Sequence, residues 1–278
     1  TSTWLLLLPT PETSLSAAEF SEAAAAMLCL PSPACSTRLG EKVSGQTKVG
    51  QFGDEIVNAK MKGDGWRTRH NAMLVRIQKL FRWAQLPVEF KVFNLFAACI
   101  PQAGLARIER GRKRQGLVPD AKVPGEKGAP AILCELKFPS ASKSRYPRNP
   151  RPRDGVRGVD RRAAGLTESY ASKARNVDWN YCGTARPPGD LRRGLPAVRE
   201  IGPVETKLRS FGLVSGWVFG ASRDASNEIH SLVNRVANAK LEVRDMEPGR
   251  RGPAKTREAQ LAGFTAYIRR QLSHLAVQ

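Results

Sequence analysis

The sequence predicts an α/β domain with helical segments at both ends, and three observations carry that prediction. Apolar residues recur at helical spacing over 68–84 and again over 160–175. Residues 88–93 alternate apolar and polar side chains, which is typical of a half-buried strand. Two further apolar runs, 116–123 and 131–138, flank a Gly-containing turn and therefore predict a β-hairpin. A helix, three strands, a second helix and further strand candidates follow one another as in α/β proteins.

The N-terminal part predicts one helix and a long loop. Ser16 and Glu19 have the spacing of a capping box, in which each side chain bonds the backbone amide of the other residue. The Ala-rich helix that follows should end before Pro31. Residues 32–66 are rich in Gly, Ser and Lys, and we expect them to be mainly loop.

The segments between the predicted core elements read as loops and strands. A long loop is expected over 94–114, and a Pro- and Arg-rich loop over 139–158. Residues 177–182 are a candidate fourth strand, residues 185–203 a further Pro- and Gly-rich loop, and residues 213–221 another strand.

Two helices are expected in the C-terminal third. Asp224 or Ser226 is in position to cap the first helix. Its apolar face comprises Ile229, Leu232, Val233, Val236 and Ala237, and that of the second comprises Leu261, Phe264, Ile268, Leu272 and Leu275. Pro and Gly residues break the chain between them. The predicted regions are therefore an N-terminal region 1–65, a core 66–243 and a C-terminal linker and helix 244–278.

The charge of the chain indicates its class of partner. It carries 45 Lys and Arg against 25 Asp and Glu, a formal net charge of +20. Such an excess favours polyanions, and we expect DNA, or else RNA, as the partner. The apolar run 4–8 is too short for a membrane span, so no membrane partner is expected. Because residue 1 is Thr, we expect a fragment or a processed piece. The oligomeric state is left open.

The cysteines argue against disulfides and zinc. There are five Cys and three His, and no C-x-x-C pair occurs. An odd count without such pairs predicts neither a disulfide framework nor a zinc site. We expect an intracellular protein with reduced thiols and no zinc.

Acidic and basic side chains meet on the predicted hairpin. Alternation along 131–138 places Glu135 and Lys137 on one face, and Asp120 lies on the neighbouring strand. Two nearby carboxylates repel each other unless a cation lies between them. Mg²⁺ or Mn²⁺ suits that position, with water and a phosphate oxygen as further ligands. Lys137 would orient the attacking water or stabilise charge developing on the phosphate. The alternative is a solvated surface ion pair.

The sequence Pro119-Asp120, followed by Glu135-Leu136-Lys137, resembles the PD-(D/E)xK motif of restriction-endonuclease-like nucleases. The resemblance covers roughly residues 66–243, where the predicted elements follow one another in the family's order. It implies an αβββαβ core with a mixed sheet flanked by helices. It also implies a metal-dependent DNA endonuclease, with Asp120, Glu135 and Lys137 as catalytic residues and Asp120 and Glu135 as metal ligands.

A narrower resemblance concerns the C-terminal endonuclease region of site-specific non-LTR retrotransposon proteins. Those proteins carry a CCHC zinc knuckle, then an Arg-His-Asn helix start, then the nuclease. Here Cys35, the segment 52–55 and the segment 67–71 precede the nuclease motif in that order. Cys35 alone remains of the knuckle ligands, whereas tetrahedral zinc takes four, so the knuckle is degenerate. Since such nucleases act on chromosomal DNA, the resemblance implies a nuclear location.

Further residues are candidates beside this motif. Glu89, His70, Tyr170 and Lys173 are accessory candidates, although each could equally be a solvated or a core residue. Basic side chains on both sides of the motif are expected to hold phosphates; they are Arg69, Arg107, Arg110, Arg112, Lys113, Arg114, Lys143, Arg145, Arg148, Arg151 and Arg153.

Two other functions fit the same features. A catalytically inactive module of this fold could bind nucleic acid without cutting it, as the lost zinc ligands suggest. An unrelated basic RNA-binding protein would share the charge, but its Asp120 and Glu135 would lie too far apart to share a metal.

Overall fold

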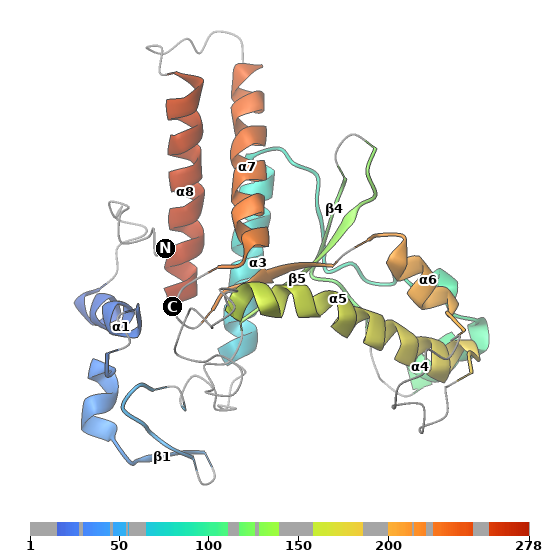
Figure 1. Ribbon diagram of the computed structural model, residues 1–278, viewed down its shortest axis with the longest axis horizontal. Helices are drawn as coiled ribbons and strands as arrows, with labels where there is room; N and C mark the ends of the chain where they lie inside the picture. The colour runs from blue at the N-terminus through green and yellow to red at the C-terminus, as the bar shows by residue number, and fades with distance from the viewer. Residues whose placement is uncertain are drawn as a thin grey trace. The chain divides into compact units, whose positions relative to one another are not determined.

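The computed structural model describes residues 16–27, 30–44, 47–53, 55, 65–110, 117–125, 128–138, 158–185, 200–212, 214–220, 225–246 and 256–277 (Figure 1). The chain divides into two compact units that are interleaved in the sequence. The first unit comprises residues 1–87, 136–163 and 216–278, and the second comprises residues 88–135 and 164–215.

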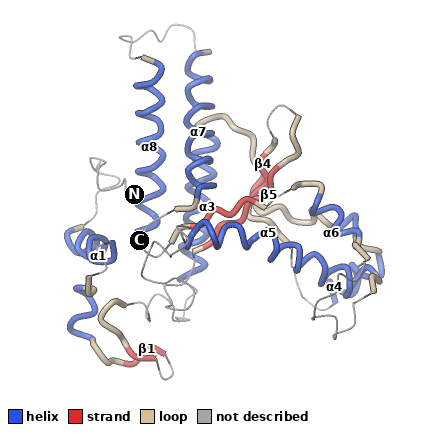
Figure 2. The backbone as a smooth tube through the Cα atoms, in the orientation of Figure 1, coloured by secondary structure: helices blue, strands red, loops and turns tan. Residues whose placement is uncertain are grey.

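Helices and strands alternate along the chain, which confirms the predicted α/β class (Figure 2). The α-helices are α1 (Ala17–Met27), α3 (Gly65–Trp83), α4 (Gln102–Arg110), α5 (Gly158–Val177), α6 (Pro203–Arg209), α7 (Asn227–Asp245) and α8 (Arg257–Val277). The strands are β1 (Lys42–Ser44), β2 (Thr47–Lys48), β3 (Glu89–Phe90), β4 (Ala121–Val123), β5 (Ile132–Lys137) and β6 (Ser215–Val218). Short helical turns occur at η2 (Pro33–Arg38), η3 (Ala97–Cys99) and η4 (Asp178–Cys182).

A four-stranded sheet has the order β3-β4-β5-β6. Strand β4 is antiparallel to both β3 and β5, with Phe90 opposite Ala121 and Ala121 opposite Cys134. The hairpin expected from the two apolar runs is therefore confirmed. Strand β3 is shorter than expected, because the backbone at Lys91 turns into the left-handed region with φ 51°.

In the first unit, α3, α7 and α8 lie side by side (Figure 1). The apolar positions predicted for α3 and α7 are buried, among them Met73, Ile77, Phe81 and Val233. Ser226 is the N-cap residue of α7, but its hydroxyl donates to the Gly216 carbonyl and accepts from the amide of Val218 instead of capping the helix amides.

The N-terminal part of the first unit has more structure than expected. The capping box is present, because the Ser16 amide donates to Glu19 and the Glu19 amide donates to the Ser16 hydroxyl. Within 32–66, expected to be mainly loop, the chain forms η2 and the small antiparallel pair β1-β2. These strands have three and two residues, too few to show the apolar alternation from which strands are predicted.

The second unit has its own core. Its buried residues come from the loop after β3, from α4, β5, α5, α6 and the start of the β6 segment; they are Phe96, Ile100, Ile108, Leu117, Leu133, Tyr170, Ala174, Val177, Val204, Leu208 and Val214. Leu133 and Tyr170 belong to this cluster, so α5 packs on the face of β5 that carries Leu133.

One expected loop is wrong in part, since helices lie within it. Residues 94–114 contain η3 and α4, whose Leu105 and Ile108 reach the core. Gly104 allows α4 to approach η4 closely, because a Cβ there would lie 2.4 Å from the Tyr181 carbonyl oxygen. The end of the 185–203 loop leads into α6.

The candidate strand 177–182 is also wrong. Helix α5 continues instead into the π-helical turn η4, which ends at Gly183 with φ 76°. Asp178 is buried in that turn, and its two carboxylate oxygens accept the amides of Val204 and Glu205 at 2.9 and 3.0 Å. These amides are unpartnered within their own helix because they lie at its start, so Asp178 caps α6.

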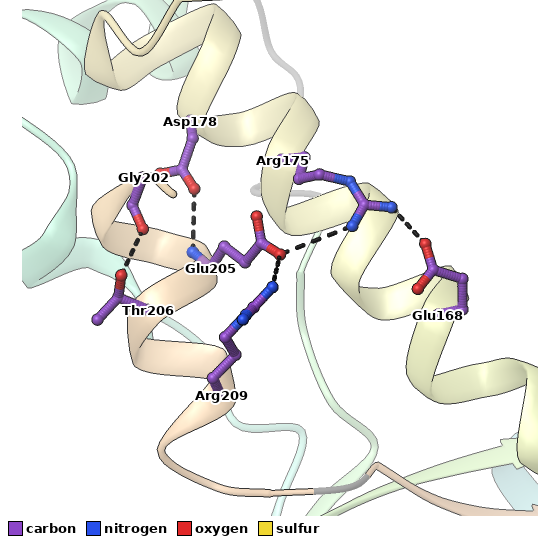
Figure 3. A network of polar contacts seen from close by, with 7 residues as sticks. All are labelled: Glu168, Arg175, Asp178, Gly202, Glu205, Thr206 and Arg209. Carbon is purple, nitrogen blue, oxygen red and sulfur yellow. Dashed lines mark hydrogen bonds and ion pairs between the residues drawn. The ribbon is translucent and has the colours of Figure 1, made fainter. Parts of the chain in front are cut away.

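A polar network joins the end of α5 to α6 (Figure 3). Glu205 is 1% exposed and pairs with Arg175 at 3.6 Å and with Arg209 at 2.9 Å. Arg175 also pairs with the exposed Glu168. Gly202 is required beside this network, since a Cβ there would lie 2.2 Å from Cγ of Asp178.

Candidate functional site

The two predicted metal-ligand carboxylates lie on adjacent parts of the hairpin. Ala121 pairs with Cys134, and extending this register by one residue places Asp120 opposite Glu135. The Asp120 amide donates to the Cys134 carbonyl at 3.0 Å, which ties the residue to β5. Asp120 is 4% exposed and Glu135 is 6% exposed. Two buried carboxylates on neighbouring strands are costly unless partners compensate their charge.

Lys91 compensates the negative charge of Asp120. Its ammonium group lies 2.5 Å from Oδ1 of Asp120, and its side chain is 40% exposed. The backbone amide of Lys91 also donates to the Asp120 carbonyl at 2.8 Å. Lys91 therefore contacts Asp120 through both its main chain and its side chain.

Tyr170 stabilises the buried carboxylate of Glu135. The phenol hydroxyl on α5 donates a hydrogen bond to Oε2 of Glu135. Burial, followed by the charge and hydrogen bond of Glu135 and the charge of Asp120, raises the pKa of Tyr170 far above its ordinary value. Both carboxylates therefore act on the phenol, and both favour its protonated, hydrogen-bond-donating form.

Three more of the predicted site residues, Lys137, Lys173 and Glu89, are described by the structure. Lys137 ends β5, two residues beyond Glu135, and its side chain is half-buried. Lys173 is exposed, and its ammonium lies 4.7 Å from the centre of the Tyr170 ring. Glu89 is exposed and pairs with Lys122 opposite it on β4 at 3.3 Å.

The structure describes only some of the predicted phosphate-binding residues. Arg69 and His70 lie near the start of α3, where the Arg69 guanidinium stands 4.7 Å from the centre of the Phe138 ring. Arg107 is exposed on α4, 5.7 Å from the centre of the Tyr181 ring. The backbone of Arg110 ends α4. The others lie outside the described residues; they are Arg112, Lys113, Arg114, Lys143, Arg145, Arg148, Arg151 and Arg153.

The oxygen donors of Asp120 and Glu135 fit a hard divalent cation. Mg²⁺ is held in proteins by one or two carboxylates, with water and substrate phosphate as its other ligands. Within the described part of the chain, no group of three or more His, Cys, Asp or Glu side chains is placed to hold a metal ion.

Lys91 is the site residue that the sequence analysis missed. It lies two residues after Glu89, so strand alternation places both on the same face as Asp120. This two-residue spacing was the feature of the sequence from which Lys91 could have been predicted. Its main-chain bond to Asp120 and its left-handed conformation depend on tertiary structure, which a lysine in a strand pattern does not indicate.

Comparison of the chain with protein-family models, with curated proteins and with solved structures finds no match in any of the three. Across the described ranges, no helix is both long and apolar enough to span a bilayer. We therefore infer function from the chemistry of the side chains themselves.

Proposed function

We propose that the protein is a metal-dependent DNA endonuclease of the PD-(D/E)xK class, derived from a retroelement and acting on nuclear DNA. The observation that carries the proposal is the pair of buried carboxylates of one hairpin, Glu135 on β5 and Asp120 directly before the neighbouring strand β4. Buried acids of like charge side by side are uncommon unless they serve a cation or a reaction.

The order of the elements supports this class. Helix α3 precedes β3, β4 and β5, and α5 and β6 follow them; with α4 and α6 taken as insertions, this is the αβββαβ order of that fold. Strand β6 is next to β5 in the sheet. Glu135 lies on the third of these strands, and Asp120 immediately precedes the second, in keeping with the motif of the class.

Each residue has a role in the proposed reaction. Asp120 and Glu135 would hold the metal ion, which, when bound, polarises the scissile phosphate and lowers the pKa of a water molecule. Tyr170 fixes the orientation of Glu135 through its hydrogen bond. Lys137, two residues further along β5, would orient the attacking water or stabilise charge on the phosphate.

The charge of the chain supports a nucleic acid as substrate. A net charge of +20 attracts a polyanion, and each phosphate neutralised by Lys or Arg releases counterions. Binding should therefore weaken steeply as salt concentration rises.

A plasmid-nicking assay tests the proposal. Wild-type protein with Mg²⁺ or Mn²⁺ should convert supercoiled DNA to the nicked form, and EDTA should abolish the conversion. Asp120→Asn and Glu135→Gln should each lose at least about a hundredfold in rate, as expected for groups that stabilise transition-state charge. Glu168→Gln is the matched control, since Glu168 is an exposed acid on α5. Equal nicking by wild type and Asp120→Asn would sink the proposal.

A second function is favoured by the pairing of the carboxylates. Asp120 is paired with Lys91, and Glu135 accepts from Tyr170, so both acids are compensated by the protein itself. A module that binds nucleic acid without cutting it would keep such pairs for stability alone. Salt-dependent DNA binding by wild type, with no nicking in any divalent metal, would favour this function.

A further inference from the structure

Lys91 is held in an unusual position beside Asp120. Its backbone has φ 51°, in the left-handed region that lysine rarely adopts. The amide of Lys91 donates to the Asp120 carbonyl, the next amide, of Val92, donates to the Pro119 carbonyl, and the amide of Phe93 donates to the Lys91 carbonyl. These bonds bend the chain where β3 ends and hold Lys91 against Asp120. Backbone strain of this kind gathers at functional sites.

The two halves of the Lys91–Asp120 pair differ in solvent exposure. The carboxylate is buried, whereas the lysine side chain is 40% exposed. A lysine ammonium is a strongly hydrated charge on a flexible stem, so it can leave for water without breaking the backbone bonds. The buried carboxylate has no such freedom, because the Asp120 backbone is bonded to Cys134 and Lys91 on its two sides.

A metal ion on Asp120 would compete with this ammonium. The ammonium lies 2.5 Å from Oδ1, and Mg²⁺ binds carboxylate oxygens at about 2.0–2.1 Å. Two cations sharing that oxygen would lie no more than about 4.6 Å apart, where like charges repel strongly in a partly buried site. The repulsion therefore favours departure of the ammonium when a divalent cation binds Oδ1.

We propose that Lys91 is the built-in counter-ion of the carboxylate site, and that a divalent cation binds there by displacing the Lys91 ammonium from Asp120. This inference rests on the proposed metal site and adds an exchange of one cation for another. Without metal, Lys91 stabilises the buried carboxylates. With metal, its ammonium is released to solvent, where it is free to meet a phosphate.

Metal binding by two charge-matched variants tests the exchange. Lys91→Gln removes the competing cation, while Lys122→Gln removes a lysine from β4 that pairs with the exposed Glu89 instead. We expect Lys91→Gln to bind Mn²⁺ about three- to tenfold more tightly than wild type, by calorimetry, and to melt at lower temperature without metal. Lys122→Gln should match wild type in Mn²⁺ affinity.

Lys91→Arg keeps the positive charge and is a second variant that keeps the test possible if Lys91→Gln fails to fold. It should retain the melting temperature without metal and should not bind Mn²⁺ more tightly than wild type. Equal Mn²⁺ affinity in wild type and Lys91→Gln would overturn the proposed displacement of Lys91 but not the proposed metal site. Absence of Mn²⁺ binding in both would overturn the exchange together with the proposed function.

Amine labelling of the wild-type protein gives a second, independent measurement. Lys91 should react faster with an acylating reagent when Mg²⁺ is present, because its ammonium no longer pairs with Asp120. Lys122 in the same sample should react at an unchanged rate, and peptide mass spectrometry separates the two lysines. An unchanged Lys91 rate at a Mg²⁺ concentration that raises the melting temperature would overturn the exchange.

Discussion

The phenol hydroxyl of Tyr170 donates a hydrogen bond to Oε2 of Glu135, and both side chains are buried in the second unit. The bond joins α5 to β5 at the centre of the candidate site. It supplies a donor to a buried carboxylate, and a buried acceptor left without its donor is destabilising. Tyr170 therefore links the stability of the unit to the orientation of Glu135.

Replacement of Tyr170 by Phe should destabilise the protein in a pH-dependent manner. At pH 7 the variant should lose about 1–3 kcal/mol of unfolding free energy, measured by urea denaturation. The pKa of Tyr170 is raised by folding, so the folded state keeps a proton that the unfolded state gives up above about pH 10. The stabilisation by Tyr170 is therefore complete below pH 10 and is lost as pH rises further.

Measurements of the unfolding free energy from pH 8 to pH 11 check the direction of this pH dependence. The gap in stability between wild type and Tyr170→Phe should stay constant up to about pH 10 and narrow above it, by up to about 1.4 kcal/mol per pH unit. A gap that stayed constant to pH 11 would show that Tyr170 ionises alike in the folded and unfolded chains.

Much of this site follows from strand periodicity. Alternation along residues 131–138 places Glu135 and Lys137 in phase, and the hairpin brings Asp120 to the neighbouring strand, as the observed register has it. The helical spacing of apolar residues in α3 and α7 likewise predicts the faces that are buried. These features depend on local patterns, which a sequence carries directly.

Tertiary contacts explain the features that the patterns missed. Residues 177–182 alternate apolar and polar side chains like a strand, yet Asp178 caps α6 and Val177 packs in the core, so the segment continues α5 as a helical turn. Lys91 leaves the strand pattern for the same reason, since its amide donates to the Asp120 carbonyl and the next amide, of Val92, donates to the Pro119 carbonyl.

Two glutamates that share Arg175 should differ in their contribution to stability. Glu205 is buried and pairs with Arg175 and Arg209, whereas Glu168 is 75% exposed. Glu205→Gln leaves buried positive charge poorly compensated, so the loss in unfolding free energy should reach about 2 kcal/mol or more. Glu168→Gln should cost less than about 1 kcal/mol, and added salt should reduce that cost. Equal losses in urea denaturation would contradict this ranking.

Cys182 should be an unreactive thiol in the folded protein. Burial, followed by the charge and hydrogen bond of Asp178, raises the pKa of Cys182 to about 12. The thiolate is the reactive form, so alkylation at pH 8 should be far slower in the folded protein than in urea. Peptide mass spectrometry identifies the site, and Cys182→Ser is the control. Asp178→Asn should speed the reaction only in part, because burial is the larger cause.

Arg69 should bind DNA phosphate from a position fixed by aromatic stacking. Its guanidinium lies over the Phe138 ring, which stacks on Phe219 at 5.7 Å. Burial lowers the pKa of Arg69, and its Nε has no hydrogen-bond partner among the described residues. The planar N–H donors of an arginine suit a phosphate oxyanion, and stacking on an aromatic ring fixes their orientation.

Arg69→Gln should weaken DNA binding to a similar extent for all sequences, because phosphate contacts carry no base information. The slope of log affinity against log salt should fall by about 0.9, the value for one lost phosphate contact. Arg257→Gln is the matched control, since Arg257 is already paired with Asp245 at 3.3 Å, and its slope should equal that of wild type. Fluorescence anisotropy with a labelled duplex at several salt concentrations measures both slopes. An unchanged slope for Arg69→Gln would assign Arg69 to packing against Phe138 alone.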